Sequence, residues 1–111
     1  MNERDKLYVV HIAEAIERIR RYTAAGRAAF MEDDMIQSAV VRQIEIIGEA
    51  ARNLSSELRS DEQAVPWRKI IGTRDRLIHG YSEVNLDAVW AIVERDLAEL
   101  DREVKRILGQ A

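Results

Sequence analysis

The segment Arg74-Asp75-Arg76-Leu77-Ile78-His79-Gly80-Tyr81 carries the residues with the clearest chemical potential in this chain. Histidine is the side chain whose unperturbed pKa lies near neutrality, so His79 can both accept and donate a proton at cellular pH. An arginine such as Arg74 can bind a phosphate group through two parallel hydrogen bonds. The segment therefore predicts a site where proton transfer takes place beside a bound anion.

The spacing of these residues limits what one helix can do with them. Asp75 and His79 are four residues apart, so on a helix they share a face and can hydrogen-bond. Each residue of a straight helix turns by about 100°, so Arg74 and His79 point about 140° away from each other. Two arrangements can still bring them together: unwinding of the chain at Gly80, or a two-fold dimer that pools two Arg and two His in one cleft.

Positive charge gathers around this segment rather than across the molecule. The chain has 17 basic and 20 acidic residues and a net charge of -3, which excludes the broad basic footprint of a protein that coats nucleic acid. Between Pro66 and Tyr81, four basic residues stand against the single acidic Asp75: Arg68, Lys69, Arg74 and Arg76. Two interpretations remain open, a local anion site and a solvated charged face.

Composition narrows the class of protein. A chain of 111 residues predicts a single domain over residues 1–111. The absence of Cys excludes disulfides, a thiol nucleophile and any thiolate metal site. Independently of composition, we expect no metal and no cofactor. No apolar run approaches the roughly 18 residues of a membrane span, and the first residues lack an apolar signal core. We therefore expect a cytoplasmic protein without a membrane segment.

Two amphipathic helices are predicted in the first half of the chain. The first runs from about Asp5 to about Ala25, and its apolar face is expected to comprise Leu7, Val10, Ala13 or Glu14, Ile16 and Ile19. The second runs from about Asp34 to Leu54 and is capped by Asp33 or Asp34. Gly48 lies inside it. Because Gly costs roughly 1 kcal/mol relative to Ala in a helix, we expect another helix to pack closely there.

Two more helices follow a polar link at residues 55–64. One opens with Pro66 and ends at Gly80, and the other begins after the cap Asn85 and ends at Gly109. Four such helices with short links predict an all-α, antiparallel four-helix up-and-down bundle, with room for an extra short helix. Trp67 and Trp90 are expected in the core or at an interface.

Two further polar residues lie on helices outside this segment. His11 lies in the middle of the first helix among apolar neighbours, and we interpret it as an ordinary helix residue. Glu49 follows Gly48 on an otherwise apolar helix. It either reaches the Arg74 segment or is an exposed carboxylate.

The stretch from Trp67 to Tyr81 resembles the signature of the HepT-like toxins of the HEPN superfamily. That signature reads Arg, then Asn or Asp, three more residues up to a His, any residue and a Tyr, which corresponds here to Arg74, Asp75, His79 and Tyr81. Residues 46–51, Ile-Ile-Gly-Glu-Ala-Ala, also resemble this family. So do the first and last helices, so that the resemblance covers nearly the whole chain. Asp75 stands where many members carry Asn.

The resemblance implies a HEPN-like helical dimer formed through the motif-bearing face, with metal-independent RNA cleavage. Candidate catalytic residues are then His79 as general acid or base, Arg74 for the phosphorane charge, and Asp75 to orient one of them. The resemblance also implies a minimal nucleotidyltransferase antitoxin, as in type VII toxin–antitoxin systems, that attaches AMP to Tyr81 in the cleft. Arg76, Arg68 and Lys69 would hold flanking RNA phosphates. The alternative is a catalytically idle helical dimer that binds a nucleotidyltransferase or a nucleotide.

Overall fold

The computed structural model describes residues 1–79 and 84–109. In these ranges every regular element is helical: α1 (Glu3–Tyr22), α2 (Arg27–Glu32), α3 (Asp34–Arg52), α4 (Ser56–Asp61), α5 (Trp67–His79), α6 (Leu86–Ala91) and α7 (Leu97–Ile107), with a π-helical segment (Ile92–Asp96) that joins α6 directly to α7. The all-α prediction is confirmed. The predicted long helices correspond to α1, α3, α5 and the continuous α6–α7 rod.

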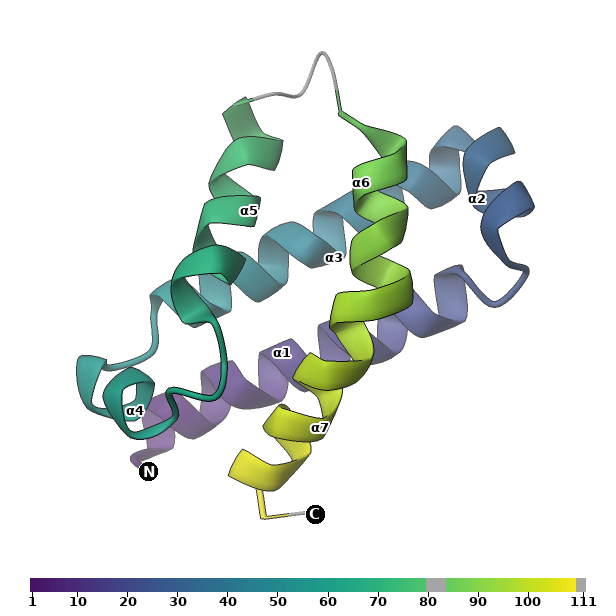
Figure 1. Ribbon diagram of the computed structural model, residues 1–111. Coiled ribbons are helices and arrows are strands. Elements are labelled where there is room, and N and C mark those ends of the chain that lie inside the picture. Colours follow the sequence, from purple (N-terminus) through teal and green to yellow (C-terminus); the bar gives the residue numbers. More distant parts are fainter. Residues whose placement is uncertain (80–83, 110–111) are drawn as a thin grey trace.

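The long helices run in opposite directions in two pairs. α1 and α3 pack side by side, while α5 and the α6–α7 rod run in opposite directions across them (Figure 1). α3 packs against both α1 and α5, and α1 also packs against α7. α3 therefore connects α5, the helix that carries Arg74, with the rest of the bundle.

Side-chain caps begin α3 and the α6–α7 rod where the sequence predicted them. Asp33 Oδ1 accepts a hydrogen bond from the backbone N–H of Met35 at 2.9 Å. Asn85 Oδ1 accepts one from the backbone N–H of Ala88 at 3.1 Å. Such bonds satisfy N–H groups that have no partner inside the helix. Both predicted caps are confirmed, and Asp33 rather than Asp34 caps α3.

The buried face of α1 matches the predicted one only in part. Ile16 and Ile19 are buried as expected, but Val9 and Ile12 are completely buried as well, and the predicted Leu7 is 51% exposed. Apolar residues occupy adjacent positions along α1, so steps of three and four fit two overlapping stripes equally well. Packing against α3 and α7 selects the stripe that passes through Val9.

Two short helices occupy the predicted links. The Ser55 Oγ accepts a hydrogen bond from the Leu58 N–H at 3.1 Å, and the Leu58 side chain is buried, so α4 forms where the sequence predicted only a polar link with turns. Gly26 precedes α2 with a φ of 94°, a left-handed conformation that favours glycine.

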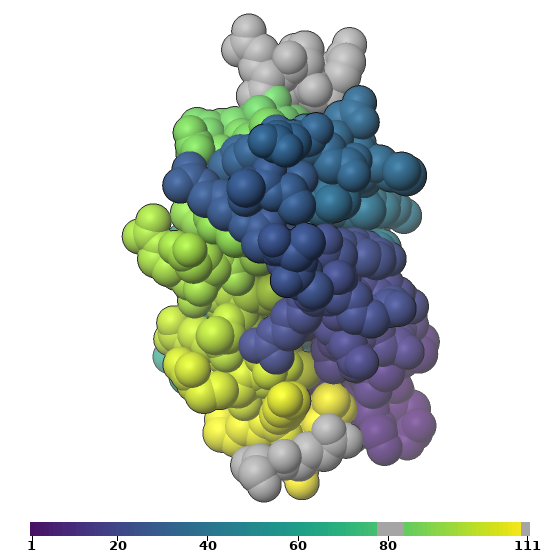
Figure 2. Space-filling model, turned by 90° about the vertical axis from the view of Figure 1, so that its right-hand side faces the viewer, coloured from purple at the N-terminus to yellow at the C-terminus, as the bar shows by residue number. Residues whose placement is uncertain are grey.

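The helix α2 closes one side of the bundle. In Figure 2, α2 and the start of α3 (blue) lie on the face where α1 (purple) approaches the α6–α7 rod. Phe30 of α2 is completely buried and its ring lies 5.3 Å from the Trp90 ring. An ion pair of 2.8 Å between Arg27 and Asp87 also links α2 to α6. These contacts fix the start of the rod.

The core lies between the two helix pairs. Trp67 is buried there and donates its indole N–H to the Glu62 carbonyl at 3.1 Å, and Trp90 is partly buried against Phe30. Of the two tryptophans expected in the core or at an interface, Trp67 belongs to the core and Trp90 packs against it from a partly buried position. Among the helices that the structure describes, none has the length and apolar character needed to cross a membrane.

Candidate functional site

The site begins with a close approach between two helices at Gly48. A Cβ atom built on Gly48 would lie 2.1 Å from the Arg74 Cβ and 2.6 Å from its Cγ. Side-chain carbons in real proteins do not come this close. The predicted close packing at Gly48 is therefore confirmed, and the residue that fills the space is Arg74 itself.

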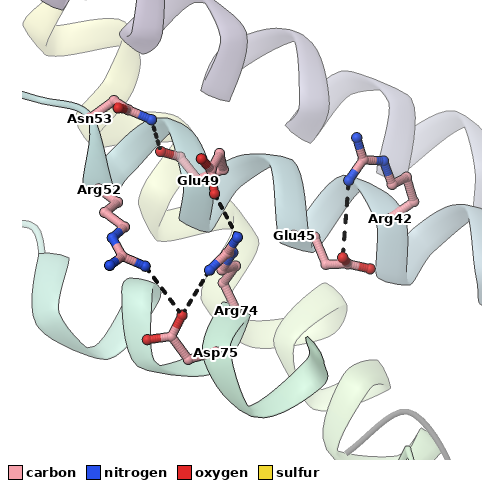
Figure 3. A network of polar contacts seen from close by, with 7 residues as sticks. All are labelled: Arg42, Glu45, Glu49, Arg52, Asn53, Arg74 and Asp75. Carbon is pink, nitrogen blue, oxygen red and sulfur yellow. Dashed lines mark hydrogen bonds and ion pairs between the residues drawn. The ribbon is translucent and has the colours of Figure 1, made fainter. Parts of the chain in front are cut away.

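Two carboxylates hold the Arg74 guanidinium. Arg74 Nη2 lies 2.7 Å from Glu49 Oε2, and Arg74 Nη1 lies 3.0 Å from Asp75 Oδ1. The Arg74 side chain is only 21% exposed, which restricts its motion. Figure 3 shows Glu49 and Arg74 pointing toward one another across the contact between α3 and α5. Both roles left open for Glu49 are found together, because its carboxylate is exposed and also contacts the motif arginine.

Asp75 stands between two arginines. Its Oδ1 faces Arg74 Nη1 at 3.0 Å and Arg52 Nη1 at 4.0 Å (Figure 3). The described contacts of Asp75 thus orient arginines. Together with Glu49, the cluster has two positive and two negative formal charges. Arg74 is therefore neutralised by its neighbours and is not a free cation in this state.

The other end of the motif is described only through its backbone. α5 continues without interruption to His79, so the backbone positions of Arg74 and His79 lie about 140° apart around the helix axis. The side chain of His79, Gly80 and Tyr81 lie outside the described residues. The geometry of the His79 imidazole and of the Tyr81 hydroxyl therefore stays a prediction.

The remaining basic residues of the segment do not join Arg74. Arg68, Lys69 and Arg76 are all exposed, and Arg76 Nη2 donates to Thr73 Oγ1 at 3.3 Å. Helical spacing turns each of them by about 120° or more from Arg74 around α5. Lys69 instead lines a groove between α5 and the rod. Phosphates held by these residues would thus lie on another side of α5.

An open pocket of about 410 Å³ lies beside Arg74. It extends from α1 across α3 to α5 and is lined by Tyr8, His11, Arg42, Glu45, Ile46, Glu49, Ala50 and Arg74. The sequence interpretation treated His11 as an ordinary helix residue, yet it lines the same pocket as Arg74. His11 is three residues from Tyr8, so both lie on the same side of α1, next to its buried face. This spacing is the local sequence feature that could have indicated that His11 lines a pocket.

The Tyr8 and His11 rings form an edge-to-face pair. Their centroids are 5.8 Å apart and their planes meet at 87°, a favourable aromatic geometry. The Arg4 guanidinium lies 5.9 Å from the centroid of the Tyr8 ring. These contacts give the α1 side of the pocket an ordered aromatic wall.

Comparison with known families matches residues 12–107 of the chain to the family described as Ribonuclease HepT-like. The chain is 40% identical over 102 residues to a protein of Caldanaerobacter subterraneus named "Putative RNase", with 91% of each chain covered. It is 35% identical over 108 residues to a protein of Thermococcus cleftensis named "Probable ribonuclease HepT", which covers 96% of this chain and 98% of that protein.

A longer relative comes from Methanocaldococcus jannaschii and is named "Gamma-glutamylcyclotransferase and putative RNase". The identity is 39% over 106 residues, which covers 95% of this chain and 48% of the relative, so the chain spans about half of that protein. No solved structure matches the chain significantly.

Proposed function

Because the chain belongs to the HepT-like ribonuclease family, we propose that it is an endoribonuclease toxin that cleaves RNA without a metal ion. The observation that carries this proposal is the position of Arg74. Its side chain is held against Gly48 and by two carboxylates, inside the region that matches the family. A guanidinium fixed in this way is suited to the phosphate of an RNA strand.

The proposed reaction is an attack of the ribose 2′-hydroxyl on the adjacent phosphorus. The bond from the 2′-oxygen to phosphorus forms and the bond from phosphorus to the 5′-oxygen breaks. One proton leaves the 2′-hydroxyl and one reaches the departing 5′-oxygen. His79 takes the role of general base or general acid in this transfer. Arg74 stabilises the negative charge that builds on the phosphorane oxygens, and Asp75 and Glu49 orient Arg74.

Arg74 is preorganised for that task, but its two carboxylate partners also compete with a phosphate. The incoming phosphate must join or displace Glu49 or Asp75 at the guanidinium. Both carboxylates are well exposed, at 53% and 44%, so each can move toward water. Rearrangement of exposed ion pairs costs little, typically about 0–1 kcal/mol.

We further propose a homodimer that joins two motif-bearing faces, and a nucleotidyltransferase antitoxin that attaches AMP to the Tyr81 hydroxyl. In the AMP transfer, the phenolic oxygen attacks the α-phosphorus of ATP, pyrophosphate leaves, and the phenolic proton goes to solvent. A bulky anion at Tyr81, two residues from His79, would block access of RNA to the motif.

The first test is RNA cleavage by the purified protein in EDTA. The wild type is expected to cleave, and His79→Ala is expected to lower the rate about 10²–10⁴-fold, the usual contribution of a general acid or base. Tyr81→Phe is the matched variant, because it keeps the ring but removes the hydroxyl. It should still cleave RNA and should no longer gain the mass of AMP when it is produced together with the antitoxin. Equal cleavage by wild type and His79→Ala would contradict the assigned role of His79.

The alternative is a catalytically idle dimer that binds the nucleotidyltransferase or a nucleotide. The neutralised Arg74 favours it, since both terminal nitrogens of the guanidinium already face carboxylates. Tight binding of the nucleotidyltransferase by a wild-type protein that leaves RNA intact, with or without Mg²⁺, would support this alternative.

A further inference from the structure

The pocket beside Arg74 lies where the ribose and base next to a phosphate bound at Arg74 would be. Arg74 of α5 lines it together with Tyr8 and His11 of α1. In an RNA strand, every phosphate is joined to a ribose and a base on both sides. A phosphate at Arg74 therefore brings a neighbouring nucleoside to the mouth of this pocket.

The aromatic wall supplies a surface on which a base can stack. Tyr8 and His11 are both half-buried, and their edge-to-face contact and the Arg4 guanidinium restrain the Tyr8 ring. Proteins that bind single-stranded RNA place unstacked bases on aromatic rings of this kind.

The charge of the pocket fits an uncharged ligand group. Its formally charged lining residues are two Arg and two Glu, so their charges cancel: Arg42, Arg74, Glu45 and Glu49. The contact between Arg42 and Glu45 is loose, at 4.0 Å (Figure 3). The Glu45 carboxylate oxygens and the Arg42 N–H groups therefore remain accessible to the hydroxyls of a ribose or the polar edge of a base. A second phosphate would find no net positive charge here.

The size of the pocket also fits. Its volume of about 410 Å³ lies in the range of roughly 300–1,000 Å³ that is typical of small-ligand sites. The opening toward solvent leaves a path for the strand to continue.

We propose that this pocket is a nucleoside subsite, which binds the ribose and base next to the phosphate at Arg74. Tyr8 and His11 are assigned to the base, and Glu45, Glu49 and Arg42 to the polar groups. This proposal rests on the proposed ribonuclease function. It adds to the cleavage motif a surface that binds and positions the RNA strand.

The direct test uses the fact that the chain has only two His. Their imidazole C–H signals in a proton NMR spectrum can be assigned with the variants His11→Gln and His79→Gln. Wild-type protein is titrated at constant pH with each of the four nucleoside 3′-monophosphates and, separately, with inorganic phosphate. At least one nucleotide is expected to shift the His11 signal saturably, and inorganic phosphate to leave it unchanged. A His11 signal that no nucleotide moves, or that phosphate alone moves equally, would overturn the subsite.

A matched pair of variants tests the same subsite in the reaction. Tyr8→Leu removes the aromatic wall, and Tyr22→Leu makes the same change at the other end of α1, where Tyr22 does not line the pocket. Tyr8→Leu is expected to raise KM for a short RNA about tenfold with little change in kcat, the effect of losing one stacked base. Tyr22→Leu should leave KM unchanged. Equal KM values for the two variants would count against the subsite.

The two experiments separate this inference from the function on which it rests. If the wild type does not cleave RNA but nucleotides still shift the His11 signal, the ribonuclease proposal fails and the pocket remains a nucleoside site. If RNA is cleaved while His11 is silent and Tyr8→Leu behaves like Tyr22→Leu, the ribonuclease stands and the subsite is rejected.

Discussion

Gly48 determines how closely the Arg74 side chain can approach α3. An added methyl group would lie within 3.4 Å of three Arg74 atoms, Cα, Cβ and Cγ. These atoms are close to the backbone of α5, so a flexible side-chain end cannot relieve the overlap. Gly48→Ala is therefore expected to push α5 away and destabilise the fold by about 1–3 kcal/mol. Urea denaturation measures the loss, and RNA cleavage should fall because Arg74 no longer meets Glu49 in the same geometry.

Gly72 provides the matched control for this prediction. It lies inside α5, and an added Cβ would meet no atom of the described residues within 4 Å. Gly72→Ala therefore changes helix propensity without a clash and is expected to stabilise the protein by about 0.5–1 kcal/mol. If both variants shift the free energy of unfolding in the same direction, the close contact at Gly48 is not what distinguishes them.

The role of a residue could be predicted from the sequence where it depends on nearby residues. It could not be predicted where it depends on which helices pack together. Gly48 was recognisable because a glycine inside a long helix needs a packing reason, and Arg74 lay in a family motif. His11 is a partly buried helix residue, as interpreted, but its place in the pocket could not be predicted because nothing within α1 shows which side chains of α3 and α5 lie near it. The pocket that gives His11 a neighbour such as Arg74 exists only after three helices have packed.

At the scale of elements, one buried carboxylate joins two helices that are far apart in the sequence. Asp5 in the first turn of α1 is only 3% exposed. It accepts hydrogen bonds from the Ser55 backbone N–H at 2.9 Å and from the Ser55 hydroxyl at 2.6 Å. Ser55 in turn caps α4 through the Leu58 N–H. The start of α1 and the start of α4 therefore share one anchor.

This anchor predicts a pH-dependent contribution to stability. Burial raises the pKa of Asp5, but the hydrogen bonds from Ser55 and the charge of Arg4 outweigh it, and the pKa lies below its usual 3.8. A carboxyl whose folded pKa is depressed stabilises the fold above its unfolded pKa and loses that effect as pH falls through the folded pKa. Asp5→Asn is thus expected to cost about 1–3 kcal/mol at pH 7, and the deficit should shrink once the pH falls below about 4.

Urea denaturation at pH 7 and pH 3 measures this difference. Asp34→Asn is the control, because Asp34 also lies in the first turn of a long helix but is exposed. Its removal should change stability by less than about 1 kcal/mol at either pH. A deficit of Asp5→Asn that is the same at both pH values would show that the charge of Asp5 is not the stabilising feature.

The elements themselves show where sequence patterns are sufficient. The starts of α3 and the rod depend on caps within a few residues. The rod's cap was predicted at Asn85, and the cap of α3 was narrowed to Asp33 or Asp34, of which Asp33 is the cap. The buried face of α1 depends on α3 and α7, and two stripes fitted the same spacing. α4 also depends on a distant partner, since Asp5 holds its cap Ser55 from fifty residues away. Local periodicity therefore predicts that a helix exists more reliably than which face it buries.

At the scale of the whole molecule, one chain does not place Arg74 and His79 on the same face of α5. The helix is unbroken between them, and its Arg74 side chain turns toward α3. A single straight helix leaves the two backbone positions about 140° apart. A two-fold dimer removes this difficulty, because the Arg74 of one subunit can meet the His79 of its partner across the shared face.

This arrangement predicts that two inactive variants restore activity when they are combined. Arg74→Ala lacks the arginine and His79→Ala lacks the histidine, so each homodimer has no complete site. A mixed dimer of the two has one site with both residues and one with neither. Random mixing makes half of the dimers mixed, so about a quarter of the wild-type cleavage rate is expected. The variants must be unfolded and refolded together so that subunits exchange.

The control is the same pair of variants refolded separately and then combined without exchange, which should stay inactive. A second control mixes either single variant with the Arg74→Ala/His79→Ala double variant. No dimer in that mixture has a complete site, so it should stay inactive. If exchange restores no activity, Arg74 and His79 must act within one subunit. The last turn of α5 would then have to unwind for the two residues to meet, and the second subunit would contribute neither Arg74 nor His79 to that site.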